Sequence, residues 1–230
     1  MIDSETKKRI WGDEKFYLFL SHKSEDKIQV AQLKEELKKY KISSFVAHED
    51  IEPAQKWQDE IENALFSMDA LVAILTNDFK NSDWTGQEIG VALGRKKPII
   101  AVRMGTDPYG FISKYQALSM NWDDIPLLAQ EIVKILLQNK KMVDAYIELM
   151  KECKSFDQAN KLAEFLPSIS SITKKQANKI LKIYSSNDQI SGSYGFTGYD
   201  EKGFDGIVHH LNRASPKTFK FDEDWNIKET

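Results

Sequence analysis

Short, nearly unbroken apolar runs alternate with amphipathic segments along the first 140 residues of the chain. Such runs are typical of strands in a parallel sheet covered on both faces, whereas apolar residues three and four positions apart are typical of helices. The apolar runs lie at 16–20, 42–47, 70–75 and 98–102, with a weaker fifth at 117–120. Segments with helical spacing lie at 30–40, 57–68, 83–93 and 125–137. This alternation predicts a doubly wound parallel sheet with right-handed crossovers and helices on both faces.

The pattern changes near residue 139, and beyond it the chain has only amphipathic helical segments. We therefore expect three parts: an N-terminal extension at 1–14, an α/β domain at 15–139, and a smaller, mostly helical C-terminal domain of unknown role at 140–230. In the last part, Pro167 is expected to break a helical hairpin.

Three pairs of residues have the spacing of a capping box, in which two polar side chains bond to backbone amides at the start of a helix. These pairs are Asp26 with Gln29, Ser155 with Gln158, and Thr173 with Gln176. Each pair predicts that a helix begins there.

Composition narrows the class of protein. The chain is 41% apolar and carries a net charge of -3, which provides no field that would attract nucleic acid. Cys153 is the only cysteine, so an internal disulfide is excluded. The polar segment 1–11 is unlike a signal peptide, and no apolar run approaches the ~20 residues of a membrane span. We expect a cytoplasmic protein that binds neither nucleic acid nor membrane.

Three polar clusters lie where predicted strands end. Ser21-His22-Lys23 follows the first run, His48-Glu49-Asp50 follows the second, and 83–88 opens the helix after the third. In an open parallel sheet, ligands bind outside the carboxyl ends of the strands. The three clusters therefore predict a ligand site on one rim of the sheet.

The motifs at this rim resemble those of a known family. Phe19-Leu20-Ser21-His22, followed by Ser24-Glu25-Asp26, resembles the opening motif of bacterial TIR domains. Segment 45–53 resembles their second strand and BB loop, and Trp84 with Glu88 resembles the helix that carries the catalytic glutamate of NAD-cleaving members. The resemblance extends over about 16–137 and implies a flavodoxin-like doubly wound sheet of five parallel strands.

The resemblance also implies roles for individual residues. Glu88 is the expected catalytic residue. The expected substrate-binding residues are Ser21, His22, Lys23, Phe45, His48, Asp50 and Trp84. NAD+ is then a substrate rather than a cofactor, and no metal is expected. His209-His210 is a poor metal pair, because adjacent helical residues point in different directions.

The chemistry of NAD+ cleavage fits this set of residues. Nicotinamide is cationic while attached to the ribose, so it leaves as a neutral molecule and needs no general acid. The reaction does need a negative group beside the ribose, where oxocarbenium charge develops, and Glu88 supplies one. Trp84 and Phe45 are candidate aromatic walls for a flat ring.

Each of these residues also has a structural interpretation. Glu88 would be a solvated helix former, Trp84 and Phe45 would be core aromatics, and the histidines would lie on the surface. A stripe of three glycines, Gly86, Gly90 and Gly94, lies along the Glu88 helix. Either this stripe packs closely on the sheet, or a second subunit approaches it.

Three functions follow as hypotheses. The first is an NAD+ glycohydrolase or cyclase that forms ADP-ribose or a cyclic isomer. By resemblance to Thoeris-type systems, it would act in bacterial antiphage immunity, through TIR self-association and with a separate effector that responds to the product. The second is a non-enzymatic TIR adaptor. The third is a nucleotide-binding sensor that reads a ligand through the C-terminal domain.

Overall fold

The computed structural model describes residues 2–46, 57–198, 203 and 205–230. The chain divides into two compact units, residues 1–133 and 134–230, which are described separately below. Among the described residues, no helix has the length and apolar character required to cross a membrane.

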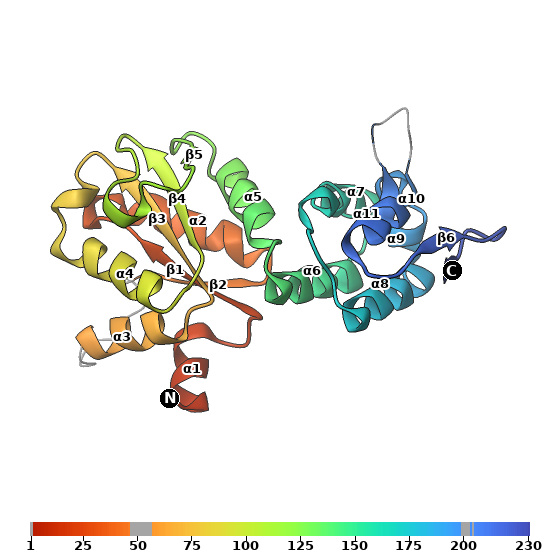
Figure 1. The fold of residues 1–230 in the computed structure, drawn as a ribbon, viewed down its shortest axis with the longest axis horizontal. Helices are drawn as coiled ribbons and strands as arrows, with labels where there is room; N and C mark the ends of the chain where they lie inside the picture. Colours follow the sequence, from red (N-terminus) through yellow and green to blue (C-terminus); the bar gives the residue numbers. More distant parts are fainter. Residues whose placement is uncertain (1, 47–56, 199–202, 204) are drawn as a thin grey trace. The chain divides into compact units, whose positions relative to one another are not determined.

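The first unit contains a five-stranded parallel sheet (Figure 1). Its strands are β1 (Phe16–Ser21), β2 (Ile42–Phe45), β3 (Ala70–Thr76), β4 (Ile99–Met104) and β5 (Leu118–Ser119). Their spatial order is β2-β1-β3-β4-β5, which is the flavodoxin-like order. The predicted fold class is therefore confirmed, and all five strands lie where apolar runs predict them.

Helices flank this sheet. They are α1 (Ser4–Trp11), α2 (Lys27–Lys38), α3 (Trp57–Ser67), α4 (Asp83–Gly94) and α5 (Ile125–Leu136), with single 3-10 turns η1 (Ser24–Asp26), η2 (Phe79–Asn81) and η3 (Gly110–Ile112). Alternate residues along a strand point to opposite faces. On one face, Phe19, Phe45 and Leu71 form a continuous apolar core with side chains of α3 and α4.

The residues expected as an N-terminal extension form α1 and pack on the first unit. The buried Trp11 ring stacks on Tyr17 with centroids 5.0 Å apart, and its Nε1 donates to Ser67 Oγ on α3 at 2.8 Å. The Arg9 guanidinium donates to both carboxylate oxygens of Glu60, also on α3. These contacts attach α1 to the helix that covers the same apolar core.

The second unit is mostly helical. It contains α6 (Lys140–Glu152), α7 (Phe156–Ala163), η4 (Leu166–Ser168), α8 (Lys174–Ser186), α9 (Asp188–Ser191), α10 (Tyr194–Thr197), α11 (Gly206–Ala214) and a hairpin of β6 (Phe219–Phe221) with β7 (Ile227–Glu229). Pro167 lies in η4, between α7 and α8, as expected for a helix break. The hairpin was not predicted, because strands of three residues give too short an alternation to detect.

The three predicted capping boxes have different outcomes. Thr173 and Gln176 form the full reciprocal box at the start of α8. Ser155 accepts from the Gln158 amide, but the Gln158 side chain accepts from the Lys154 amide instead. Asp26 is the N-cap of α2, so the helix begins where predicted, but the capping bonds are absent: the Asp26 side chain instead accepts from Thr76 Oγ1 at 3.0 Å.

Candidate active site

Helix α4 follows β3 and turns one face toward the sheet. Its buried residues are Thr85, Glu88, Ile89 and Ala92, the spacing of a helix face that packs on a core. The Thr85 hydroxyl donates to the Phe79 carbonyl at 2.8 Å, which ties the start of α4 to the turn after β3. Glu88 therefore lies on the buried face of α4, where the other residues are apolar or, in the case of Thr85, hydrogen-bonded.

Glu88 is a buried carboxyl group that forms one hydrogen bond with the described residues. Its side chain is only 4% exposed, and Ser21 Oγ donates to Oε2 at 2.5 Å. Among the described residues, no cation pairs with it. Burial raises the pKa of Glu88 to about 7, while the hydrogen bond from Ser21 opposes this rise. The interpretation of Glu88 as a solvated helix position is therefore wrong.

The end of β1 supplies the neighbours of Glu88. Ser21 is the last residue of β1 and is fully buried. His22 is buried, with Nδ1 at 3.0 Å from the Leu20 carbonyl oxygen; since that oxygen only accepts, Nδ1 donates. Lys23 pairs with Glu25 at 3.4 Å. The structure thus brings Ser21 to Glu88, and places His22 and Lys23 next to Ser21 in the chain.

The two candidate aromatic walls have different surroundings. Trp84 is half-buried and lies on α4 one turn before Glu88. Phe45 is completely buried, with ring centroids 5.4 Å from Phe19 and 6.1 Å from Trp11. The structure does not bring Phe45 to the rim, because it pairs with Phe19 in the sheet and α1 contributes Trp11 to the same cluster. Phe45 therefore supports the end of β1 from within the core.

The remaining predicted residues, His48 and Asp50, lie outside the described residues. They follow β2, whose described part ends at Phe45.

A pocket of about 330 Å³ opens at the carboxyl ends of β1 and β3. Lys23, Asp26 and Thr76 line it, together with Trp122 from the segment after β5. In this strand order, the sheet reverses its winding direction between β1 and β3, which is where such folds bind ligands. Trp122 was missed by sequence reasoning, because its place at the rim depends on a strand order that the hydrophobic pattern does not specify.

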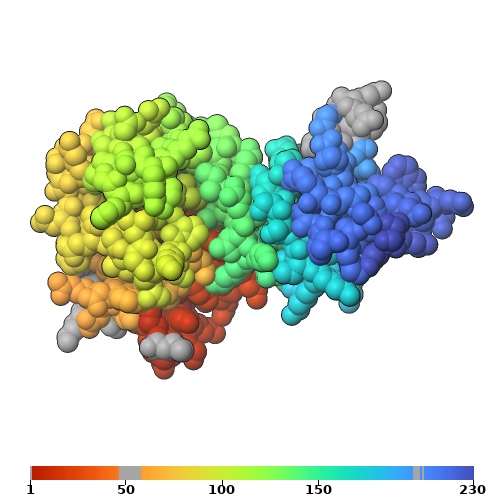
Figure 2. Space-filling model, viewed as in Figure 1, coloured from red at the N-terminus to blue at the C-terminus, as the bar shows by residue number. Residues whose placement is uncertain are grey.

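The glycine stripe of α4 is exposed rather than packed on the sheet. Figures 1 and 2 show α4 at the surface of the first unit, in yellow. A Cβ atom added at Gly86, Gly90 or Gly94 would meet nothing within 4 Å. The interpretation that these glycines allow close packing on the sheet is therefore wrong.

The adjacent histidines of α11 differ in exposure. His209 is exposed, whereas His210 is buried, and burial lowers the pKa of His210 to about 4. Among the described residues, no group of three His, Cys, Asp or Glu side chains is arranged to hold a metal ion.

Comparison with known proteins agrees with the fold. A family model described as a TIR domain matches residues 18–136, just over half of the chain. The chain therefore belongs to the TIR domain family. Among solved structures, it is similar to the TIR domain of the Toll-related receptor TRR-2 from Hydra magnipapillata, at 17% identity and a TM-score of 0.42. That match covers 51% of this chain and 94% of that chain. A search of curated proteins found no match.

Proposed function

We propose that this TIR domain cleaves the bond between nicotinamide and ribose in NAD+, with Glu88 as the catalytic residue. The observation that carries the proposal is a buried glutamate whose one hydrogen bond from a described residue comes from a serine hydroxyl. A buried carboxylate without a cation is costly, and such groups gather at functional sites.

The substrate supplies a positive charge, which none of the described residues brings to Glu88. NAD+ carries its positive charge on the nicotinamide ring, and during cleavage this charge moves onto the ribose. A carboxylate beside the ribose attracts the positive ring when NAD+ binds, and it attracts the positive charge on the ribose more strongly in the transition state. An interaction that is stronger in the transition state than in the bound substrate is what accelerates a reaction. Binding of the cationic ring is therefore expected to lower the pKa of Glu88 and to release a proton.

The bonds balance without a general acid. The bond from ribose C1′ to the ring nitrogen breaks, its electron pair returns to the ring, and neutral nicotinamide leaves. Water adds at C1′ and loses a proton, which gives ADP-ribose. If a nucleophile within the substrate adds at C1′ instead, the product is a cyclic isomer.

Other residues of the rim have supporting roles in this proposal. Trp84, half-buried one turn before Glu88, is a candidate wall for the flat ring. Lys23 lines the pocket at the ends of β1 and β3 and is a candidate partner for the pyrophosphate. The role of Trp84 rests on its position one turn before Glu88 on α4, and that of Lys23 on its position two residues after Ser21. Lys23 already pairs with Glu25, which lines the same pocket, so the pyrophosphate would have to compete with that carboxylate.

Assembly between TIR domains is a second candidate function, and the exposed glycine stripe of α4 favours it. A protein that acts only as an adaptor does not need a buried carboxylate, which lowers stability. We therefore propose assembly in addition to catalysis and not as an alternative to it. By family resemblance, the product would act in antiphage immunity, either through loss of NAD+ or as a signal to a separate effector.

Release of nicotinamide by the full chain, followed by chromatography, tests the proposal. Glu88→Gln keeps the shape of the side chain and removes its charge, and should slow release at least about a hundredfold. Glu62→Gln, at an exposed position of α3, is the matched control and should leave release unchanged. A folded Glu88→Gln protein with normal turnover would exclude Glu88 from catalysis.

A further inference from the structure

A second pocket of the first unit, of about 470 Å³, lies at the carboxyl ends of β4 and β5, and we call it the β4–β5 pocket. Met104 and Trp122 line it. The same two residues line the pocket at the carboxyl ends of β1 and β3. The two pockets are therefore neighbours along one rim of the sheet.

Three apolar side chains form the wall of the β4–β5 pocket. Met104, Met120 and Trp122 line it, and all three are half-buried. The indole Nε1 of Trp122 donates to no group of the described residues, whereas Nε1 of Trp11 donates to Ser67. Methionine side chains are adaptable and pack well against flat rings. Trp122 therefore offers a ligand both a flat face and a hydrogen-bond donor.

The polar groups of the β4–β5 pocket leave it without net charge. Arg103 and Asp107 both line it, and Arg103 Nη1 donates to the Asp107 carboxylate at 2.9 Å. The other lining residues among those that the structure describes are uncharged. A neutral pocket with an apolar wall suits an uncharged planar group better than it suits a phosphate.

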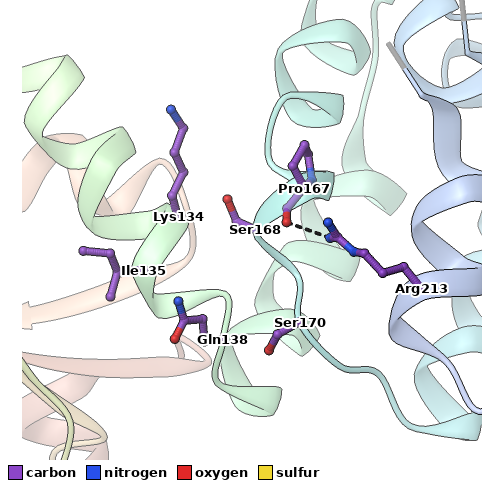
Figure 3. A pocket seen from close by; sticks show the side chains of 7 residues that line it. All are labelled: Lys134, Ile135, Gln138, Pro167, Ser168, Ser170 and Arg213. Atoms are coloured by element: carbon purple, nitrogen blue, oxygen red, sulfur yellow. Dashed lines mark hydrogen bonds between the residues drawn. The ribbon is translucent and has the colours of Figure 1, made fainter.

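Arginine side chains in this protein also connect elements. In the second unit, Arg213 Nη2 donates to three backbone carbonyl oxygens around η4, among them that of Pro167 at 2.6 Å (Figure 3). Arg103 has a comparable role in the first unit, because its Nη2 donates to Ser119 Oγ at 2.7 Å and so connects β4 to β5. This bond holds two sides of the β4–β5 pocket in place.

The chain after β4 is held closely against the end of β3. Gly105 forms an isolated bridge with Thr76, and the Thr106 amide donates to the Leu75 carbonyl at 3.0 Å. Gly105 has a φ of +131°, and a Cβ atom added to it would collide with the side chain of Asn77. This close approach fixes the segment of the rim that contributes to both pockets, so the β4–β5 pocket is preformed.

We propose that the β4–β5 pocket binds the adenine ring of NAD+, with Trp122 as the stacking partner. The choice of this nucleotide rests on the proposed function. Adenine is flat and uncharged, and its edge carries both donors and acceptors, which matches a neutral pocket with an aromatic wall. The volume lies within the range of about 300–1,000 Å³ typical of small-molecule sites.

The strand order places this pocket within reach of Glu88. Ser21, which donates to Glu88, ends β1, and β4 and β5 lie two and three strands away. At the usual spacing of strands this is about 10–14 Å, a distance that an extended dinucleotide spans. Nicotinamide beside Glu88 and adenine on Trp122 can therefore belong to the same substrate molecule.

Comparison of two substrates tests the adenine site. Nicotinamide mononucleotide keeps the cationic ring, the ribose and one phosphate, but has no adenosine. Trp122→Ala removes the stacking surface and should lower the ratio of kcat/KM for NAD+ to that for the mononucleotide about tenfold or more. Trp122→Phe keeps a ring and should retain most of this ratio. Trp225→Ala, at an exposed tryptophan of the second unit, is the matched control and should leave the ratio unchanged. An unchanged ratio in Trp122→Ala would overturn the proposal.

Calorimetric titration of the full chain with ADP-ribose separates a failure of this proposal from a failure of the proposed function. ADP-ribose has the adenine ring but no nicotinamide. It should bind saturably, and Trp122→Ala should weaken its binding about tenfold or more. Ribose 5-phosphate, which lacks the base, should bind much more weakly than ADP-ribose.

The two failures then have different signatures. If the chain releases no nicotinamide but ADP-ribose binding depends on Trp122, the adenine site stands without NAD+ cleavage. No saturable binding of ADP-ribose to the wild-type chain, or unchanged affinity in a Trp122→Ala protein with a normal melting curve, would overturn the adenine site whatever the outcome for cleavage.

Discussion

Among its described residues, the first unit buries two glutamates to nearly the same extent, Glu60 at the start of α3 and Glu88 on the inner face of α4. They are 3% and 4% exposed. Both oxygens of Glu60 accept from the Arg9 guanidinium, whereas Glu88 accepts only from the Ser21 hydroxyl among the described residues. The difference separates a buried charge that the chain itself neutralises from one that, in the proposed function, a cationic substrate neutralises. The first attaches a helix, and the second is the candidate catalytic group.

The same substitution at these two glutamates should have opposite effects on stability. Glu60→Gln weakens a charge-assisted pair and should destabilise the first unit by about 2 kcal/mol. Glu88→Gln should instead stabilise it at pH 8, because the wild-type chain then buries a carboxylate and the variant does not. The free energy of unfolding from denaturant titration measures both.

The pH dependence of the Glu88→Gln effect follows from its raised pKa. Below pH 4.5 the carboxyl is protonated in both the folded and the unfolded chain, so it costs nothing. Between pH 4.5 and about 7, the Glu88 carboxyl is ionised in the unfolded chain but still mostly protonated in the folded chain. The free energy of unfolding of the wild type therefore falls as the pH rises through this range. The difference between the pKa values of the unfolded and the folded chain lowers the free energy of unfolding by about 3 kcal/mol at pH 8. An equal effect of Glu88→Gln at pH 4 and pH 8 would contradict this account.

Ser21→Ala should change the pH profile rather than abolish activity. The Ser21 hydroxyl stabilises the charged form of Glu88, so its loss should raise the pKa of Glu88 further. In the wild type, kcat/KM for NAD+ cleavage should rise with pH and level off above about 7. In Ser21→Ala, this rise should move upward by about one pH unit. A profile that drops in height without moving would mean that Ser21 acts in some other way.

The exposed glycines of α4 should give the smallest effect. Each Gly→Ala change at Gly86, Gly90 or Gly94 has room for the new methyl group and should stabilise the isolated chain by about 1 kcal/mol. If a second subunit approaches this stripe, nicotinamide release per chain rises with protein concentration, and the alanine variants should weaken that rise. A dilution series with light scattering for mass separates the two effects. Constant activity per chain from a lasting monomer would exclude assembly at this surface.

The hydrophobic pattern predicted the central strands well, because β1, β3 and the first part of β4 are short, buried apolar runs. The burial of Glu88 was harder to predict, because a polar residue within a helix is usually exposed. Its helical spacing from Ile89 and Ala92, which lie on the same buried face as Thr85, did indicate burial.

Phe45 shows what the pattern alone could not provide. Its contact with Trp11 depends on α1, which a polar N-terminal segment did not predict as part of the core. The place of Trp122 at the rim likewise required the strand order. Short-range periodicity predicts elements, whereas these contacts join residues far apart in the chain.

Titration of the Glu88 carboxyl shows whether this buried group interacts with a cationic substrate. The carboxyl carbon can be followed by ¹³C NMR over a pH series, with Glu88→Gln to assign the signal. In the free chain, we expect the pKa of Glu88 to be about 7. With a non-cleavable analogue of NAD+ that keeps the positive ring, the pKa should fall, and an analogue with a neutral ring should have much less effect. An ordinary pKa near 4.5 in the free chain, or no difference between the two analogues, would contradict the account.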